Sequence, residues 1–233
     1  MALKVFSSGS TPELSPALFF DASGTRVRIG ILNDEFWAAY RESESQALAA
    51  IFGEVEAVLD SAKITWPEIQ SYLYVEGPGS VLGLRIAAMA IRAWQVEDAK
   101  VANGASRPVF SCNSLQLAAA LASTEIKPPF AVFTEARHGH WHVLEIAPTD
   151  LANPCSQKAR EVGENDLPGG PLYHIQSRKA WHKPPARAQA LAVSLEKHPE
   201  ALRHRELLRR GTTATPYTGT SPEYKKWAGA TKV

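Results

Sequence analysis

The residues whose types and spacing best suit chemistry lie in one loop, Gly77-Pro78-Gly79-Ser80, between an apolar run and a helical pattern that ends near Trp94. Glycine adopts backbone conformations closed to other residues, and proline fixes its own φ, so this loop is stiff and narrow. A narrow loop before a helix leaves backbone amides pointing outward, where they can hold a phosphate, a carboxylate or another chain. An ordinary strand-to-helix turn within an α/β sheet is the alternative interpretation.

The loop differs from the two common phosphate-binding motifs. No Lys-Ser or Lys-Thr pair follows it at the Walker spacing, and the third glycine of the dinucleotide fingerprint is missing. In the helix that follows, Gly83, Ala87 and Ala90 keep one side thin, while Leu84 and Ile91 supply apolar bulk. We therefore expect another helix to pack closely against this side.

Other side chains capable of chemistry form less specific patterns. His138, His140 and His142 alternate and would share one face of a strand, so a metal site is one hypothesis and solvent-facing histidines are the other. Ser80 and Cys112 have no histidine that the sequence places beside them. We therefore predict no catalytic residue of this kind.

The elements that must position these residues alternate between strand and helix in the first half of the chain. Residues 18–40 predict a three-stranded meander, residues 46–60 an amphipathic helix, and Thr65–Glu68 a capping box. A strand at 108–112 precedes a helix that Ser114 can cap. This order predicts a mixed sheet covered by helices.

A second unit is expected from residue 129 onward, after a disordered leader at 1–17 and a first lobe at 18–128. Strand-like segments 130–134 and 140–146 predict a hairpin, and the Pro- and Gly-rich stretch 147–171 predicts a long loop. We expect a strand at 172–175 and then two helices. The first is opened by Pro184-Pro185 and broken at Pro199, and the second, basic helix spans 201–210.

Composition narrows the class of protein. The chain has 233 residues, of which 45% are hydrophobic, and its 25 basic residues nearly balance its 24 acidic ones. This predicts a globular protein without a global field for nucleic acid or anionic membranes, and without a signal peptide or membrane span. Cys112 and Cys155 give no disulfide framework, so we expect a cytoplasmic location. The arginines at 203–210 form a solvated face or, alternatively, help to contact nucleic acid within a larger assembly.

The string from Gly77 to Ser80, with Gly83-Leu84-Arg85-Ile86 after it, resembles the signature loop of the bacterial TsaB (YeaZ) family. Residues 110–115, 134–139 and 217–227 resemble further segments of that family, whose proteins serve the tRNA threonylcarbamoyladenosine pathway. The resemblance is good over residues 18–146. It implies an α/β chain with the actin-like ATPase (ASKHA, ribonuclease H-like) fold, in two lobes with a shortened second lobe.

The resemblance also implies roles for particular residues. In that fold the first-turn residues, here Asp21, Ser23 and Thr25, face nucleotide phosphates and metal, although in TsaB this phosphate turn looks degenerate. The catalytic relative, TsaD, carries a His-x-x-x-His metal pair on the helix after the meander. In this chain Ser43–Leu48 contains no histidine, which argues against this chain being the catalyst.

The function implied is that of a non-catalytic scaffold that pairs with a TsaD-type protein. A TsaE-type ATPase joins the complex, which transfers a threonylcarbamoyl group to adenosine 37 of tRNA, and tRNA is met through the complex. The chain is expected to need no cofactor of its own, although ATP or ADP could bind at the interface, and alone it could form a homodimer. The expected partner interface comprises Leu48, Ile51, Phe52, Gly77, Pro78, Gly79, Ser80, Gly83, Ala87 and Ala90.

The alternative is an enzyme. An actin-fold ATPase or phosphotransferase would use Asp21, Ser23 and Thr25 on the phosphates and a carboxylate elsewhere to activate the nucleophile. No Asp-x-Gly turn follows in the second half to complete the cleft.

Overall fold

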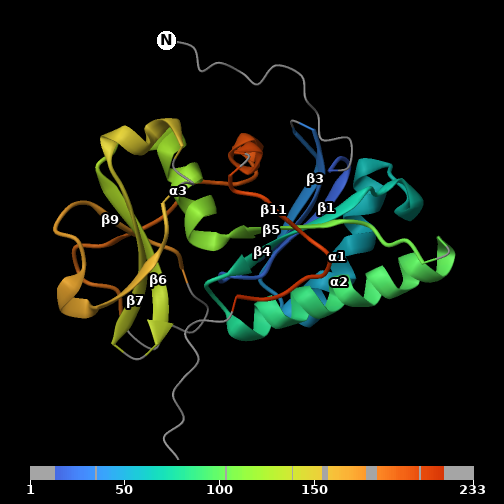
Figure 1. Ribbon diagram of the computed structural model, residues 1–233, viewed down its shortest axis with the longest axis horizontal. Coiled ribbons are helices and arrows are strands. Elements are labelled where there is room, and N and C mark those ends of the chain that lie inside the picture. The colour runs from blue at the N-terminus through green and yellow to red at the C-terminus, as the bar shows by residue number, and fades with distance from the viewer. Residues whose placement is uncertain are drawn as a thin grey trace, which may run out of the picture.

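The computed structural model describes residues 14–34, 36–102, 104–137, 139–153, 157–176, 183–204 and 206–217. Their strands form two sheets, which Figure 1 shows as two lobes side by side, with α3 at the junction. Most of the expected leader, together with His138, Cys155 and the segment from 218 onward, lies outside the described residues. Among the residues described, no helix has the length and apolar character needed to cross a membrane.

The first sheet has the order β11-β5-β4-β1-β2-β3. Its strands are β1 (Ala17–Asp21), β2 (Val27–Asn33), β3 (Phe36–Ser43), β4 (Ser71–Gly77), β5 (Val109–Asn113) and β11 (Arg209–Gly211). Strands β1, β2 and β3 pair antiparallel, which confirms the predicted meander, and β1, β4 and β5 run parallel. Strand β11 pairs antiparallel with β5 and returns the end of the chain to this sheet.

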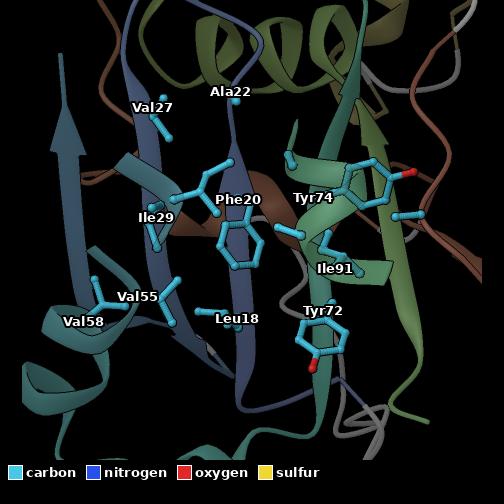
Figure 2. Packing of buried hydrophobic residues seen from close by; sticks show 14 of the residues in the cluster. Leu18, Phe20, Ala22, Val27, Ile29, Val55, Val58, Tyr72, Tyr74 and Ile91 are labelled. Carbon is cyan, nitrogen blue, oxygen red and sulfur yellow. The ribbon is translucent and has the colours of Figure 1, made fainter. Parts of the chain in front are cut away.

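Helices cover both faces of the first sheet because its central strands are apolar on both sides. Leu18 and Phe20 of β1 pack under α1 (Ala47–Ala62) and α2 (Val81–Val101), as Figure 2 shows for part of this cluster. Ala17 and Phe19 point to the opposite face, where α3 (Ser114–Glu125) packs. All four side chains have no exposed surface, so β1 is the centre of the first lobe.

The second sheet has the order β10-β9-β6-β7-β8. Its strands are β6 (Phe130–Arg137), β7 (His140–Ile146), β8 (Arg160–Gly163), β9 (Leu172–His174) and β10 (Gln189–Ala190). The β6–β7 hairpin is confirmed. The stretch 147–171 is not simply a loop, because it contains β8 and two short 3₁₀ helices, Pro148–Ala152 and Glu164–Asp166.

The predicted helices after residue 183 are wrong. Residues 183–198 hold only the short strand β10, and Pro199–Arg203 forms a 3₁₀ helix, followed by β11. Pro184-Pro185 holds the chain extended, since each proline disfavours helix in the residue before it. Val193, Leu195 and Leu207 then bury against the first sheet beside α3, where long-range packing determines their conformation.

The predicted helix start at residue 114 is displaced by one position. Asn113, not Ser114, caps α3, and its side-chain oxygen accepts hydrogen bonds from the amides of Leu115 and Gln116 at 3.0 and 3.3 Å. Asparagine is as good an N-cap as serine, and its position at the end of β5 places it first. Ser114 is therefore free of the capping role and makes a different contact, described below.

Candidate functional site

Both carboxylate oxygens of Asp21, at the end of β1, are engaged by neighbouring residues. Oδ1 accepts hydrogen bonds from the amide and hydroxyl of Ser23 at 2.9 and 2.6 Å, and Oδ2 accepts one from Arg28 Nη1 at 3.0 Å. Asp21 is only 3% exposed. A carboxylate that already faces a guanidinium is a poor ligand for a divalent cation, because the two cations would repel each other.

This ion pair follows from the strand register. Asp21 and Arg28 are direct partners across β1 and β2, so their side chains lie on the same face of the sheet. Arg28 also donates to Glu42 of β3, which accepts further hydrogen bonds from Arg26 and Tyr40. Burial disfavours the charge of Glu42, but the donors from Arg26 and the charge of Arg28 outweigh it and hold its pKa below the ordinary value. The first turn is thus part of a charge network that the chain balances internally.

The glycine loop packs directly on this first turn. The amide of Ser80 donates to the carbonyl of Ser23 at 2.8 Å. A Cβ at Gly79 would lie 2.3 Å from the Ser23 carbonyl oxygen, and one at Gly83 would lie 2.2 Å from that of Ala22. Only glycine fits at both positions, because backbone atoms cannot move aside as a flexible side chain can.

Other contacts hold the loop in place. The hydroxyl of Ser114, at the start of α3, donates to the carbonyl of Pro78 at 2.5 Å. The hydroxyl of Ser80 accepts a hydrogen bond from the amide of Gly83 at 3.3 Å and caps α2. The amide of Ser80, which the loop was expected to leave available to a ligand, is therefore used within the chain, and so is the amide of Gly83.

A cleft of about 440 Å³ opens beside the first turn, between the two lobes. Asp21, Ser23 and Thr25 all line it, so the structure brings the three predicted residues together at one site. Its other walls are the apolar side of α3, with Leu117 and Leu121, and residues that follow β9 and β10 in the second lobe. The cleft is large enough for a small molecule, but its polar end is the ion-paired turn.

The residues predicted for the partner interface divide into exposed and buried groups. On α1, Leu48 and Phe52 are 58% and 50% exposed. Gly79 and Ser80 are half-buried, and the remaining six, Ile51, Gly77, Pro78, Gly83, Ala87 and Ala90, are buried. The thin side of α2 thus faces its own sheet, and the close approach that Gly83 permits is taken up by Ala22.

A different face of α2 is exposed and apolar. Leu82, Met89 and Val96 are 70%, 67% and 56% exposed, and Val81 beside them is 62% exposed. Leu82, Met89 and Val96 recur at every seventh residue, which places them in one stripe along a helix. This stripe was missed in the sequence, although its seven-residue period is the signal that could have revealed it.

Gly53 on α1 is exposed and lies next to Phe52. A Cβ built on it would meet nothing within 4 Å, so the fold of this chain does not require glycine there. Glycine within a helix costs about 0.5–1 kcal/mol relative to alanine. A residue without a side chain at an exposed helix position allows a second helix to pack closely there. Such packing would explain a glycine that the fold of this chain does not itself require.

The histidines, Cys112 and Ser80, which the sequence offered as further candidates for chemistry, do not form a site within the residues described. No group there of three or more His, Cys, Asp or Glu side chains is placed to hold a metal ion. His142 is buried, and this burial lowers the pKa of its imidazole. Cys112 is also buried, with no exposed surface, and Ser80 uses its hydroxyl to cap α2.

Residues 42–197 match the model of the family described as TsaD, tRNA N6-adenosine threonylcarbamoyltransferase. No curated protein sequence matches the chain significantly. Among solved structures, YeaZ from Pseudomonas aeruginosa is similar with a TM-score of 0.57 and 15% identity, covering 87% of this chain and 99% of that one.

A second structure, described as an uncharacterized protein with similarity to peptidase YEAZ from Pseudomonas aeruginosa, has a TM-score of 0.57 and 16% identity. The match covers 87% of this chain and 98% of that chain. These likenesses confirm the predicted actin-like ATPase fold in two lobes.

Proposed function

Because this chain belongs to the TsaD family, we propose that it acts in the threonylcarbamoylation of tRNA, as a non-catalytic subunit that pairs with a catalytic TsaD-type protein. The observation that carries the non-catalytic role is the ion pair of Asp21 with Arg28. In a family whose chemistry uses a metal and nucleotide cleft, a first-turn carboxylate already neutralised by arginine supports a protein that stabilises its partner.

The outer faces of α1 and α2 form the proposed pairing surface, which we define by its exposed apolar residues Leu48, Phe52, Leu82, Met89 and Val96. The two helices lie against each other, and the rings of Phe52 and Trp94 join them with centroids 5.7 Å apart. Apolar side chains that recur every seven residues along an exposed helix favour a partner helix laid nearly parallel to it.

The other members of the complex follow from this arrangement. A TsaE-type ATPase and tRNA would join through the catalytic partner, because the chain has a formal net charge of only +1 and so no strong attraction for nucleic acid. ATP or ADP would bind at the interface with the partner. When the partner is missing, the same apolar surface would drive formation of a homodimer.

Pairing is tested by co-purification with the TsaD-type protein of the same organism. Met89→Asp places a charge in the middle of the pairing surface and should weaken the complex at least about tenfold, as for an interface hot spot. Phe36→Asp is the matched control, because Phe36 is also exposed, at 58%, but lies on strand β3 and on neither of the two helices. Equal pairing by Met89→Asp and the native chain would contradict the proposed surface.

The role in tRNA modification needs a separate measurement. Threonylcarbamoyladenosine in total tRNA should fall when the chain is depleted, and should be restored by the native chain and Phe36→Asp but not by Met89→Asp. If Met89→Asp restores the modification fully, the pairing surface is wrong. If depletion leaves the modification unchanged, the function is wrong.

The enzyme alternative is favoured by one observation, the cleft of about 440 Å³ that the first turn lines. It predicts ATP turnover that Asp21→Ala abolishes. The subunit proposal predicts no turnover by the purified chain, with or without Mg²⁺. Turnover that depends on Asp21 would favour the enzyme.

A further inference from the structure

The last described residues of the chain form a strap along the first lobe, defined here as residues 212–217. The strap follows β11 and is held by side chains of α2. Gln95 Nε2 donates to the Thr212 carbonyl at 3.1 Å, and Arg92 Nε donates to the Ala214 carbonyl at 2.7 Å. Ala214, the second of these anchored residues, is fully buried in the core under α1 and α2. The strap is thus an integral part of the lobe, although it has no regular secondary structure of its own.

The strap then reaches the glycine loop. The hydroxyl of Tyr74 donates to the Thr215 carbonyl and accepts from the Thr215 amide, both at 2.7 Å. The amide of Tyr217 donates to the carbonyl of Glu76, one residue before the loop, at 2.7 Å. A Cβ at Gly77 would lie 3.0 Å from Cβ of Tyr217, so the strap closes over the start of the loop.

Tyr217 also connects the two lobes. Its ring meets the imidazole of His142 on β7 edge to face, with centroids 5.6 Å apart and an interplanar angle of 89°. One residue at the end of the strap therefore contacts both the glycine loop of the first lobe and a central strand of the second. Movement of the strap would alter both contacts.

Arg92 gives the strap a link to the outer face of α2. Arg92 is exposed and lies three positions after Met89, which is part of the pairing surface. Its Nε nevertheless donates to the strap, at the Ala214 carbonyl. Arg85, one turn before Met89, is also exposed, and within the described residues it makes no hydrogen bond or ion pair. Of these two exposed arginines, Arg92 alone joins the pairing surface to the strap.

We propose that the strap is a conformational device in which Arg92 couples the pairing surface of α2 to the glycine loop and, through Tyr217, to the second lobe. A carboxylate of a bound partner that draws the Arg92 guanidinium outward would loosen the strap at Ala214. This regulatory step rests on the proposed function, whereas the coupling itself is a property of the free chain.

Amide hydrogen exchange of the full chain without partner tests the coupling. Arg92→Gln should speed exchange at Thr215 and Tyr217 about three- to tenfold, which corresponds to the loss of one hydrogen bond. Arg85→Gln is the matched control and should leave both amides unchanged. Unchanged exchange in Arg92→Gln, or equal acceleration in both variants, would overturn the proposal.

A second measurement follows the link to the second lobe. Since burial lowers the pKa of His142, removing the ring that covers it in Tyr217→Ala should raise this pKa, followed by NMR titration, while Tyr217→Phe should leave it unchanged. An unchanged pKa in Tyr217→Ala would overturn the interlobe link. Neither measurement uses the partner. Their results therefore test the coupling within the chain even if the proposed function is wrong.

Discussion

Arg28 Nη1 lies 3.0 Å from Asp21 Oδ2, and the two residues are direct partners across β1 and β2. The pair sits where the cleft between the lobes meets the first sheet. The side chain of Asp21 is 4% exposed and that of Arg28 is 32% exposed, so the carboxylate depends on the arginine for its neutralisation. The charge at the polar end of the cleft is therefore satisfied before any ligand arrives.

Arg28→Met should lower the free energy of unfolding by about 1–3 kcal/mol, because it leaves the buried Asp21 carboxylate without its charged partner. Urea denaturation measures the change. Arg26→Met is the control, since Arg26 is 52% exposed and its ion pairs lie at the surface, and it should change stability by less than about 0.5 kcal/mol. Equal effects of the two substitutions would show that the Asp21–Arg28 ion pair contributes no more to stability than a surface ion pair does.

Gly83→Ala should lower the free energy of unfolding by about 1–3 kcal/mol or more, because its Cβ would overlap the Ala22 carbonyl. The same denaturation experiment measures it. A larger side chain at this position, as in Gly83→Arg, would disturb folding because of the same contact. Loss of pairing in that variant could not be assigned to the surface, so Met89→Asp is the better test of pairing. A Gly83→Ala protein as stable as the native one would contradict the close contact.

Gly53→Ala should have opposite effects on folding and on pairing. The free energy of unfolding should rise by about 0.4–1 kcal/mol, because alanine restricts the unfolded chain and its Cβ meets nothing in this fold. If a partner helix packs against Gly53, the same methyl group should weaken the complex with the TsaD-type protein. A stabilised chain that pairs as tightly as the native one would exclude Gly53 from the interface.

His198 should make stability depend on pH. Its Nδ1 lies 2.9 Å from Glu200 Oε1 and its Nε2 lies 3.2 Å from Glu125 Oε1 at the end of α3. These hydrogen bonds, that to Glu200 first, raise the pKa of the imidazole above its ordinary value. A raised pKa means that the protonated form stabilises the fold. This contribution is complete below the ordinary pKa of histidine, about 6.5, and is lost as pH rises through the higher folded value.

The check is His198→Gln, measured by denaturation at several pH values. The native chain should exceed the variant in stability by more at pH 5.5 than at pH 8.5. A difference that grows toward high pH would contradict the assigned direction of the shift.

Local signals in the sequence were enough to predict most of the first lobe, without β11, and the first hairpin of the second lobe. The meander, α1 and the β6–β7 hairpin follow from alternation, helical period and turn residues that act over a few positions. The segment after residue 183 could not be predicted in this way. Val193, Leu195 and Leu207 have the composition of a helix face, but their conformation is set by burial against strands β1, β4 and β5, which lie far earlier in the chain.

The candidate site shows the same limit. The sequence placed Asp21, Ser23 and Thr25 at one turn correctly, yet nothing local predicts that Arg28 neutralises Asp21, since this depends on the strand register. The orientation of α2 is a further example. The side of Gly83, on which we expected another helix to pack, faces the chain's own sheet, and the exposed side with Leu82 and Met89 was not singled out. Because both carry small or apolar residues, periodicity alone cannot tell which side meets β1 and which remains exposed.

The position of β11 has a consequence for how the protein folds during its synthesis. Strand β5 ends at Asn113, but its partner β11 begins at Arg209, and Ala214 fills the core only after that. During synthesis from the N-terminus, every strand of the second sheet leaves the ribosome before the first sheet can be completed. The lobe that begins first is therefore finished last, and until then its open edge at β5 is available to chaperones or to mispairing with another nascent chain.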